Sequence, residues 1–328
     1  MINIENLNPI FICGHRASGG GLLTGLLDFH PELLVYPDES KFFYLFYPIM
    51  NKDDISSSEK INYLIKNNLE FLKNILFEKC NGDSTYFNFD LFIKRFEELA
   101  SNGVNWHNYL KAMIQTYSEI SPQEKKMIKY WVERTSSSEI YAKDIVDAFP
   151  KAKFIHILRD PRDNYASLKS RWDEKLQYLS DSSSLESLIQ SCIERCRLGL
   201  EMGLMNKKLF GKEKYFFSKY EDLVKNLDNS LGRIATFLDI NPNLFSKTPT
   251  FCGLPWIGNN FSGKLFKGVS PIQVGRWRER ITEDEAALIE FHFKDLMKIF
   301  GYKMEFSYSQ HKNLKYYTTM SVTLFVSL

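Results

Sequence analysis

A short apolar run, a glycine-rich loop and a helical pattern follow one another close to the start of the chain. Residues 9–13 (Pro-Ile-Phe-Ile-Cys) predict a buried strand, and the four leucines of residues 22–27 recur at helical spacing. The loop between them, residues 14–21, holds four glycines. Backbone N–H groups of such a turn converge on an anion at the positive end of the helix dipole. The feature predicts a phosphate-type site, and the alternative is a tight turn in a doubly wound α/β fold.

The loop differs from the P-loop of nucleoside-triphosphate enzymes in its last residues. A P-loop ends in Gly-Lys-Ser or Gly-Lys-Thr, whose lysine clamps the phosphates and whose hydroxyl holds magnesium. Here residues 19–21 are all glycine, so we expect an anion that is bound without a metal ion. The residues expected to line this site are Gly14, His15, Arg16, Ala17, Ser18, Gly19, Gly20, Gly21 and Leu22.

Four further β-rich runs alternate with helical patterns along the chain. They are residues 33–36, 128–132, 153–158 and 215–218. This alternation predicts an α/β fold with a doubly wound parallel sheet and helices on both of its faces. Loops at the carboxyl ends of parallel strands converge on one crevice, so residues far apart in sequence can share a site there.

The chain of 328 residues is long enough for one large domain with an insertion. Residues 45–121 contain amphipathic stretches of helical length and no strand pattern. We therefore expect a single domain over residues 1–328, in which residues 45–121 form a helical insertion over the crevice.

The charges of the chain are nearly balanced, with 42 Lys and Arg against 40 Asp and Glu. No overall positive field attracts nucleic acid, so we expect no nucleic-acid partner and a locally built anion site. The first residues lack a basic and then apolar leader, and no run of about 18 apolar residues occurs. We therefore expect a soluble, cytoplasmic protein with no membrane anchor.

The cysteines form no Cys-x-x-Cys pair and no cluster with histidine at zinc spacing. They are Cys13, Cys80, Cys192, Cys196 and Cys252. This distribution favours a reducing compartment and no structural metal. The histidines at positions 107, 156 and 292 lie in apolar or amphipathic runs, where packing explains them more simply than catalysis.

A second anion-binding candidate follows the strand expected at residues 153–158. Arg159 comes directly after it, where the fork of guanidinium donors is able to grip a phosphate. Ser167 offers a hydroxyl from the next helix, whose first positions suit Asp160 and Pro161. The alternative for Arg159 is an ordinary ion pair at the edge of the sheet.

Together these two segments resemble the motifs of sulfotransferases that use 3'-phosphoadenosine 5'-phosphosulfate (PAPS). The glycine loop with its helix, which ends in His30-Pro31, is similar to the family's 5'-phosphosulfate loop. The run from Arg159 to Ser167 is similar to its 3'-phosphate motif, in which the matching arginine and serine hold that phosphate. The resemblance implies a P-loop-like fold and the transfer of a sulfuryl group from PAPS to a hydroxyl or amine, without a metal.

Two later segments extend the resemblance. Residues 219–223 are similar to the family's Tyr-Glu-Asp-Leu run, which implies that Tyr220 lies near the adenine. Lys267 and Gly268, with residues 275–278, look like its late basic-Gly and Gly-x-Trp-Lys segment, which implies that Lys267 and Gly268 contact the cofactor. The resemblance spans about residues 9–281, and the helical insertion is unmatched.

A candidate catalytic base follows the second expected strand. In the polysaccharide-acting branch of the family, the catalytic glutamate stands in a Glu-x-His-Phe-Phe-like run, and residues 38–43 match that register, which implies Glu39 as the base. Independently, a carboxylate at this strand end faces the glycine loop across the crevice. The alternative is a solvated acidic turn, and Asp38 is a possible substitute.

A candidate for charge stabilisation lies at the end of the third expected strand. Residues 133–135 (Glu-Arg-Thr) resemble the same branch's Glu-Lys-Thr/Ser run, which implies that Arg134 approaches the transferring group. The alternative for Arg134 is a surface ion pair.

The loop departs from the family pattern at two positions. Ala17 stands where the family has an arginine or lysine, and Gly20 stands where it has a threonine. Arg16 and Arg134 are the residues that can restore positive charge near the leaving phosphate. Two other functions therefore stay open: a non-catalytic nucleotide-binding or interaction protein, and a kinase with a degenerate P-loop. Sugars, lipids, peptide tyrosines and small phenols all remain open as acceptors.

Overall fold

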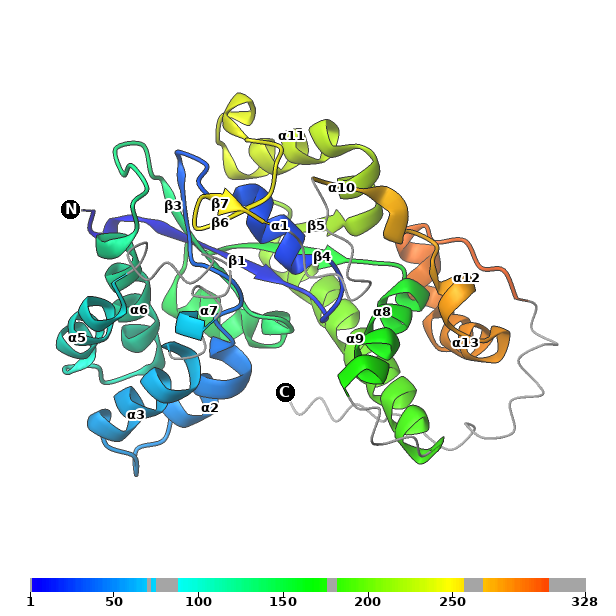
Figure 1. Ribbon diagram of the computed structural model, residues 1–328, viewed down its shortest axis with the longest axis horizontal. Helices are drawn as coiled ribbons and strands as arrows, with labels where there is room; N and C mark the ends of the chain where they lie inside the picture. The colour runs from blue at the N-terminus through cyan, green and yellow to red at the C-terminus, as the bar shows by residue number, and fades with distance from the viewer. Residues whose placement is uncertain (1, 70–71, 75–87, 176–181, 257–267, 307–328) are drawn as a thin grey trace. The chain divides into compact units, whose positions relative to one another are not determined.

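A five-stranded, all-parallel sheet forms the centre of the first part of the fold (Figure 1). This computed structural model describes residues 2–69, 72–74, 88–175, 182–256 and 268–306. The strands are β1 (Asn8–Cys13), β2 (Leu33–Val35), β3 (Tyr130–Arg134), β4 (Lys153–Leu158) and β5 (Tyr215–Lys219), in the order β2-β3-β1-β4-β5. The α/β fold expected from the sequence is confirmed, and each strand overlaps its predicted run.

The central strands are buried on both faces, as is usual for parallel sheets. In β1, Phe11 belongs to an apolar cluster on the first face, while Ile10 and Ile12 belong to a second cluster on the opposite face. Trp131 and Phe154 join Phe11 from the neighbouring strands, and their rings lie 5.5 and 5.8 Å from the Phe11 ring between centroids. Alternate side chains therefore serve two separate cores, one against each layer of helices.

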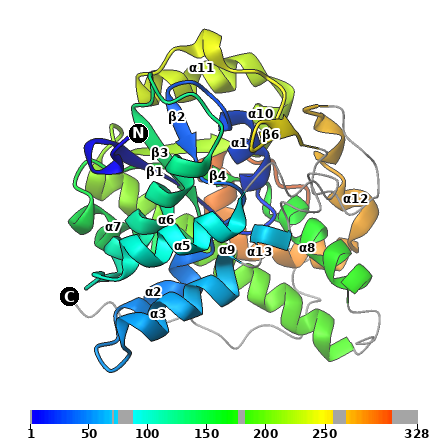
Figure 2. The same ribbon diagram turned by 60° about the vertical axis from the view of Figure 1, so that its left-hand side comes forward.

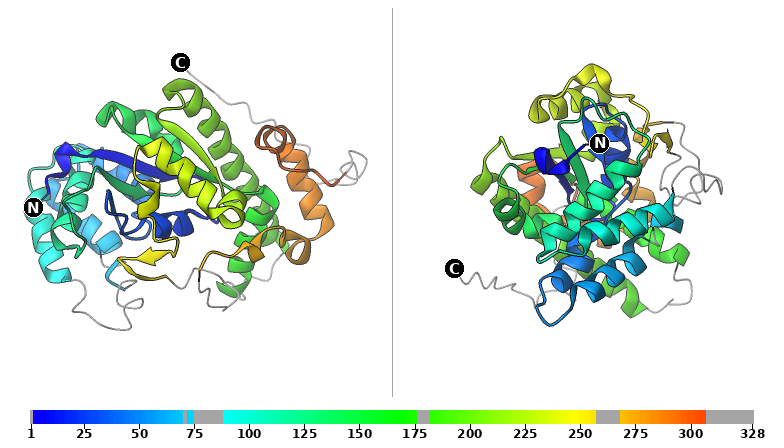
Figure 3. Two further views of the ribbon diagram at one scale, coloured as in Figure 1. Left: turned by 90° about the horizontal axis from the view of Figure 1, so that it is seen from above. Right: turned by 90° about the vertical axis from the view of Figure 1, so that its left-hand side faces the viewer.

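Helices from different parts of the chain cover the two faces. The first face is covered by residues of η2 (Phe42–Phe46), α5 (Phe89–Ala100), α6 (Trp106–Ile120) and α7 (Ala142–Ala148), and Figure 2 shows α5 and α6 in front of the sheet. The second face is covered by α1 (Gly20–Leu27), α10 (Tyr220–Lys225) and α11 (Leu227–Leu238), and Figure 3 shows α11 in yellow-green.

The connections around β1 and β3 create a crevice. After β1 the chain enters α1 on the second face, whereas after β3 it enters η5 (Ser138–Tyr141) and α7 on the first face. Because β1 and β3 are neighbours whose helices leave toward opposite faces, their carboxyl ends flank the point where doubly wound folds bind ligands.

The segment between β2 and β3 is helical in its described residues, which include no strand. Besides η2, α5 and α6 it contains α2 (Tyr47–Met50), α3 (Ser57–Leu64) and η3 (Ile65–Leu69). Its aromatic side chains, among them Phe42, Phe46, Phe92 and Tyr109, are buried in the cluster of the first face. The position of residues 45–121 over the crevice stays a prediction.

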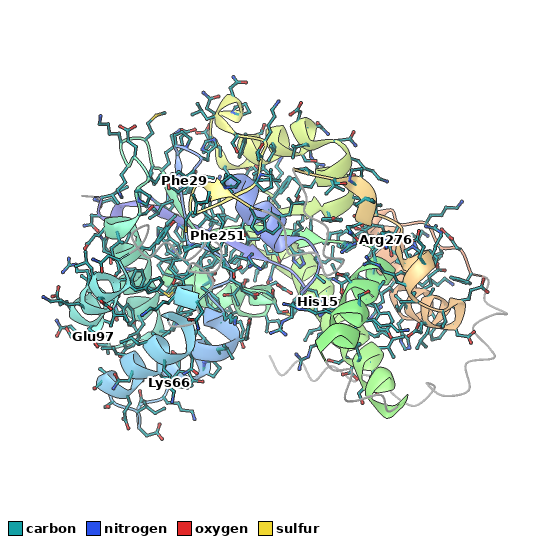
Figure 4. All side chains as sticks on the ribbon, in the orientation of Figure 1. His15, Phe29, Lys66, Glu97, Phe251 and Arg276 are labelled. Atoms are coloured by element: carbon teal, nitrogen blue, oxygen red, sulfur yellow. The ribbon has the colours of Figure 1, made fainter. Side chains whose placement is uncertain are left out.

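A small hairpin contacts the end of α1. It consists of β6 (Thr250–Phe251) and β7 (Leu254–Pro255), which pair antiparallel after η6 (Pro242–Leu244). The Thr250 hydroxyl and the Gly253 N–H both donate to Asp28 at the end of α1, each at 2.8 Å. Figure 4 labels Phe29 and Phe251 at this junction.

The contacts divide the chain into two compact units. The first comprises residues 1–159 and 198–272, and the second comprises residues 160–197 and 273–328. The second contains α8 (Pro161–Lys175), η7 (Pro271–Gln273) in part, α12 (Trp277–Arg280), α13 (Glu283–Phe300) and the first half of α9 (Ser182–Phe210). Whether the two units fold as one domain stays a prediction.

Buried charges organise the second unit. The Arg162 guanidinium donates to Asp160 and, at 2.5 Å, to Glu290, whose side chain is fully buried. It also lies 4.4 Å from the centroid of the Trp277 ring. Among the described residues of the chain, no helix combines the length and the apolar character that crossing a bilayer requires.

Candidate active site

The glycine loop after β1 adopts a backbone that side chains would prevent. Gly14 and Gly19 have φ values of 119° and 101°. A Cβ atom on Gly14 would lie 2.2 Å from the carbonyl oxygen of Ile157, and one on Gly19 would lie 2.4 Å from the Tyr220 ring. Both positions therefore require glycine. Ala17 is also left-handed, with φ 62°.

Hydrogen bonds fix the start of this loop and leave the end of it open. The Gly14 N–H donates to Glu139 Oε2 at 2.8 Å, and the Gly14 carbonyl accepts the Ser137 N–H at 3.0 Å. The first N–H groups of α1 have no partner within the helix, and Gly20 and Gly21 place no side chain over them. The loop thus presents the positive end of a helix.

The other residues of the loop differ in exposure. Ser18 is buried and its N–H donates to the His15 carbonyl at 3.2 Å. His15, which Figure 4 labels at the loop, and Leu22 are half-buried. Arg16 is exposed, and its guanidinium lies 5.2 Å from the centroid of the Tyr44 ring.

Arg134, the last residue of β3, connects the loop to two carboxylates. Its Nη2 donates to Asp38 Oδ1 at 2.9 Å, and its Nη1 lies 3.6 Å from Glu39 Oε2. A Cβ atom on Gly20 would lie 3.2 Å from Arg134 Cδ. The structure therefore brings Arg134, Glu39 and the start of α1 into one cluster at the carboxyl edge of the sheet.

The environment of Glu39 favours its ionised form. Burial alone would raise the pKa of Glu39, but Arg134, the Ser136 N–H and Arg16 outweigh it and hold this pKa below its ordinary value. The Ser136 N–H donates to Glu39 Oε1 at 2.8 Å. Glu39 is consequently a carboxylate at neutral pH, the form that accepts a proton.

A second glutamate lies beneath this cluster, and the sequence did not single it out. Glu133 is fully buried and accepts hydrogen bonds from the hydroxyls of Ser40 and Thr135. Burial raises its pKa to about 7, although both hydroxyls act in the opposite direction. Ser40 directly follows Glu39 and its N–H also donates to the Arg134 carbonyl at 3.0 Å, so this network positions the turn that carries Glu39.

Arg159 and Tyr220 flank the loop on its other side. Arg159 Nη1 donates to the Ala17 carbonyl at 3.1 Å, and the guanidinium lies 4.6 Å from the centroid of the Tyr220 ring. The Tyr220 ring in turn touches Gly19. The glycine loop and Arg159, the two features of the first unit that the sequence predicts to bind anions, are therefore in direct contact.

Of the remaining candidates, two lie among the described residues and one lies outside them. Ser167 is half-buried on α8 and belongs to the second unit, whereas Arg159 belongs to the first. Gly268 is half-buried in the first unit. Lys267 lies outside the described residues.

Within the second unit, Asp163 connects the start of α8 to residues 275–278. The resemblance to the family matched these two segments separately. Its carboxylate accepts the Gly275 N–H at 2.6 Å and the Trp277 N–H at 2.9 Å. Asp163 lies on α8 and is buried. No residue pattern pointed to it, because its partners are more than a hundred positions away in the chain.

A pocket borders the cluster of Arg134. It lies between α1, the end of β2 and the β6–β7 hairpin, and its lining includes Gly21, Thr24, Asp28, Asp38, Arg134 and Trp256. Burial raises the pKa of Asp28 to about 6 despite its three hydrogen bonds. Arg134 and Asp38 are thus shared between the pocket and the cluster at the start of α1.

Comparison with known families agrees with this geometry. A model described as the sulfotransferase family matches residues 9–243, well over half of the chain. The chain belongs to the sulfotransferase family. The resemblance to the PAPS-dependent sulfotransferases that the loop and the Arg159 segment indicated is thereby confirmed. No curated protein matches the chain.

Solved structures share the fold of this sulfotransferase. A sulfotransferase domain from the curacin biosynthetic pathway is 17% identical, with a TM-score of 0.58 over 91% of this chain and 99% of the other. One from the Synechococcus PCC 7002 olefin synthase is 18% identical, with a TM-score of 0.55 over 92% and 97%. The sulfotransferase STF9 from Mycobacterium avium is 14% identical, with a TM-score of 0.51 over 92% and 79%. At these identities the likeness shows the fold.

Proposed function

We propose that this member of the sulfotransferase family transfers the sulfuryl group of PAPS to a hydroxyl or amine of an acceptor. The glycine loop binds the 5'-phosphosulfate with its N–H groups, and Arg159 binds the 3'-phosphate together with the Ser167 hydroxyl. Tyr220 lies near the adenine, and Lys267 and Gly268 contact the cofactor. The contact between Arg159 and the loop supports this assignment, because one nucleotide can reach both.

In the proposed reaction the acceptor oxygen attacks sulfur in line with the bridging oxygen. The new oxygen–sulfur bond forms as the bond from sulfur to the bridging oxygen breaks, and 3'-phosphoadenosine 5'-phosphate (PAP) leaves. Glu39 takes the proton of the acceptor. Arg134 and Arg16 stabilise the negative charge that develops on the leaving phosphate.

The observation that carries the proposal is the position of Arg134. Its side chain lies where the side chain of a larger residue at Gly20 would begin, while its guanidinium pairs with Asp38 and Glu39. The loss of the family's threonine at this position therefore coincides with an arginine beside the helix end. This supports a catalytic protein over a binding protein, since positive charge is retained where the sulfuryl group would move.

We place the acceptor hydroxyl at the mouth of the pocket that Asp38 and Arg134 help to line. Aromatic and carboxylate groups, Trp256 and Asp28 among them, share this lining. Such a combination suits a sugar or another polyhydroxyl compound, because rings cover apolar faces and carboxylates accept from hydroxyls. Lipid, peptide and phenol acceptors belong in the same screen.

Transfer of radioactive sulfate from labelled PAPS to a panel of sugars, lipids, tyrosine peptides and phenols tests the proposal. With an acceptor found, Glu39→Gln should lower kcat by about 10²- to 10⁴-fold, the usual contribution of a general base. PAP affinity, measured by calorimetry, should change little. Glu124→Gln is the control, because Glu124 is an exposed carboxylate that precedes β3 at the opposite edge of the sheet.

Three outcomes would overturn the proposal or part of it. Tight PAP binding with background transfer to every acceptor would indicate the non-catalytic nucleotide-binding protein. Magnesium-dependent ATP binding without PAP binding would indicate the degenerate kinase. Full activity of Glu39→Gln would remove Glu39 as the base while leaving the transfer itself intact.

A further inference from the structure

Four buried polar side chains meet beneath the glycine loop, on the first face of the sheet. Cys13 ends β1, His156 lies in β4, Tyr215 begins β5 and Glu139 lies in η5. The Tyr215 hydroxyl lies 2.8 Å from His156 Nδ1 and 3.6 Å from Cys13 Sγ. None of the four side chains belongs to the cluster around Glu39 and Arg134, and each residue is at most 2% exposed.

The ligand atoms of three of these residues converge. One atom from each of Cys13, Glu139 and His156 lies within 4.8 Å of the other two. Three atoms spaced in this way have a common point within about 2.8 Å of each, which small side-chain movements shorten to the usual zinc distances of about 2.0–2.3 Å. The chain thus gathers a sulfur, a nitrogen and an oxygen donor around one point.

One of these donors is unsatisfied. Glu139 Oε2 accepts the Gly14 N–H, but Glu139 Oε1 is buried and has no hydrogen-bond partner among the described residues. A buried carboxylate oxygen without a donor or a cation is costly.

Helix α9 covers the cluster with two glycines one turn apart. A Cβ atom on Gly199 would lie 2.4 Å from Glu139 Oε1, and one on Gly203 would lie 2.6 Å from His156 Nδ1. The helix therefore faces the donor atoms with bare backbone. A side chain at Gly199 would occupy the space in front of the unsatisfied oxygen, and one at Gly203 would occupy the space in front of His156 Nδ1.

We propose that Cys13, Glu139 and His156 bind a zinc ion. Thiolate, imidazole and carboxylate are the three protein ligands of zinc. Burial lowers the pKa of His156 to about 3, so its imidazole is neutral and able to coordinate. The positive charge of zinc displaces the protons of Cys13 and Glu139, and Tyr215 orients the ligands through its hydroxyl.

The proposed site is separate from sulfuryl transfer. Its ligands come from two strands and one 3-10 helix that are far apart in the sequence, which explains why the spacing of cysteines and histidines gives no sign of it. Because Glu139 also accepts the Gly14 N–H, the ion would brace the first residue of the glycine loop.

Metal titration of the full chain tests the proposal. Protein stripped with a chelator should bind one equivalent of Zn²⁺ in calorimetry. Co²⁺ in its place should give the sulfur-to-cobalt charge-transfer absorption and the strong visible bands of a tetrahedral thiolate site. Bound Zn²⁺ should also raise the midpoint of thermal unfolding, since a ligand of the folded state stabilises it.

Variants at two of the three residues test whether they bind the ion. Cys13→Ser should abolish the charge-transfer absorption, and Cys192→Ser, which changes a buried cysteine of the second unit, should retain it. Glu139→Gln keeps an acceptor for the Gly14 N–H and should weaken Zn²⁺ binding at least about tenfold. Thermal unfolding of the Glu139→Gln variant without metal, compared with that of the wild type, shows whether the fold is preserved.

Any of three results would contradict the proposal. They are no binding of Zn²⁺ by the stripped wild-type protein at micromolar concentrations, binding of Co²⁺ without a charge-transfer absorption, and binding of Zn²⁺ by Cys13→Ser as tight as that of the wild type. None of these results bears on PAPS or on the acceptor, so the proposed function is tested separately.

Discussion

Glu39 and Glu133 are close in space, yet their surroundings move their pKa values in opposite directions. Arg134, Arg16 and the Ser136 N–H hold the pKa of Glu39 below its ordinary value against the effect of burial. Burial raises the pKa of Glu133 to about 7, and the negative charge of Glu39 adds to this effect. One carboxyl group is therefore ready to accept a proton, while the other is half protonated near neutral pH.

The raised pKa of Glu133 predicts a pH dependence of stability. The folded state keeps this proton up to about pH 7, whereas the unfolded chain releases it near pH 4.5. The free energy of unfolding should therefore fall as the pH rises from 4.5 to about 7 and level off above it. A shift of this size corresponds to at most about 3 kcal/mol.

Urea unfolding at a series of pH values measures this slope, and Glu133→Gln should make it shallower. Glutamine has the shape of the protonated acid and cannot ionise, so only the contribution of Glu133 is removed. Glu124→Gln, at an exposed carboxylate, should leave the slope unchanged. An identical slope in wild type and Glu133→Gln would contradict the prediction.

Among single residues, the sequence predicts those site residues that lie next to the end of a strand. It misses residues whose partners are distant in the sequence and come close only in the folded chain. Glu39, Arg134 and Arg159 follow or end strands, and all of them contact the loop region or each other as parts of one edge. Glu133 is fully buried, and only the approach of Ser40 from the turn after β2 shows its role. The unsatisfied Glu139 is a similar case.

At the scale of elements, Asp163 connects the start of α8 to the segment that leads into α12. It is buried, and it accepts two backbone N–H groups at 2.6 and 2.9 Å. Hydrogen bonds to a charged acceptor of this kind are stronger than neutral ones. Trp277 also holds this segment, because its side chain is buried against Ala166 and Ala286.

Asp163→Asn should loosen this connection without affecting the glycine loop. The amide loses the charge and offers one acceptor oxygen in place of two, so the free energy of unfolding should fall by about 1–3 kcal/mol. Hydrogen exchange should accelerate in residues 273–280 and remain unchanged in residues 14–21. Glu279→Gln is the control in the same segment, because Glu279 is exposed. Equal acceleration in both regions would show that Asp163 acts on the whole fold.

The sequence predicts elements well where one short pattern decides them. All five strands of the sheet overlap apolar runs bounded by turn residues, because most of their side chains pack into one of the two cores. The β6–β7 hairpin has two residues per strand and depends on its bonds to Asp28, so no local pattern indicates it. The π-helical turn of η2 after the left-handed Lys41 likewise follows from packing.

At the scale of the whole molecule, the near balance of charge makes anion binding a local property. The chain has a net charge of +2, so no long-range field concentrates a nucleotide near it. Arg16, Arg134 and Arg159 instead surround the loop, and each has a different neighbour: Tyr44, the Asp38–Glu39 pair and Tyr220. If the proposed function holds, selectivity for PAPS over other nucleotides arises from individual contacts.

The free energy of unfolding of the whole chain, measured with bound ligands, tests the proposed contact between Arg159 and the 3'-phosphate. PAP and adenosine 5'-monophosphate differ only in the 3'-phosphate, so the difference between their stabilising effects isolates the group assigned to Arg159. At a hundred times its Kd, a ligand of the folded state adds about 2.7 kcal/mol to the free energy of unfolding. At equal concentrations PAP should stabilise the wild type by about 1.5–3 kcal/mol more than the monophosphate, the value of a charged hydrogen bond.

Arg159→Ala should remove most of this difference, whereas Arg233→Ala, which changes an arginine stacked on Phe216, should preserve it. A difference that survived in Arg159→Ala would place the 3'-phosphate on other residues, because a group that does not touch the ligand cannot change the comparison between two ligands that share everything else.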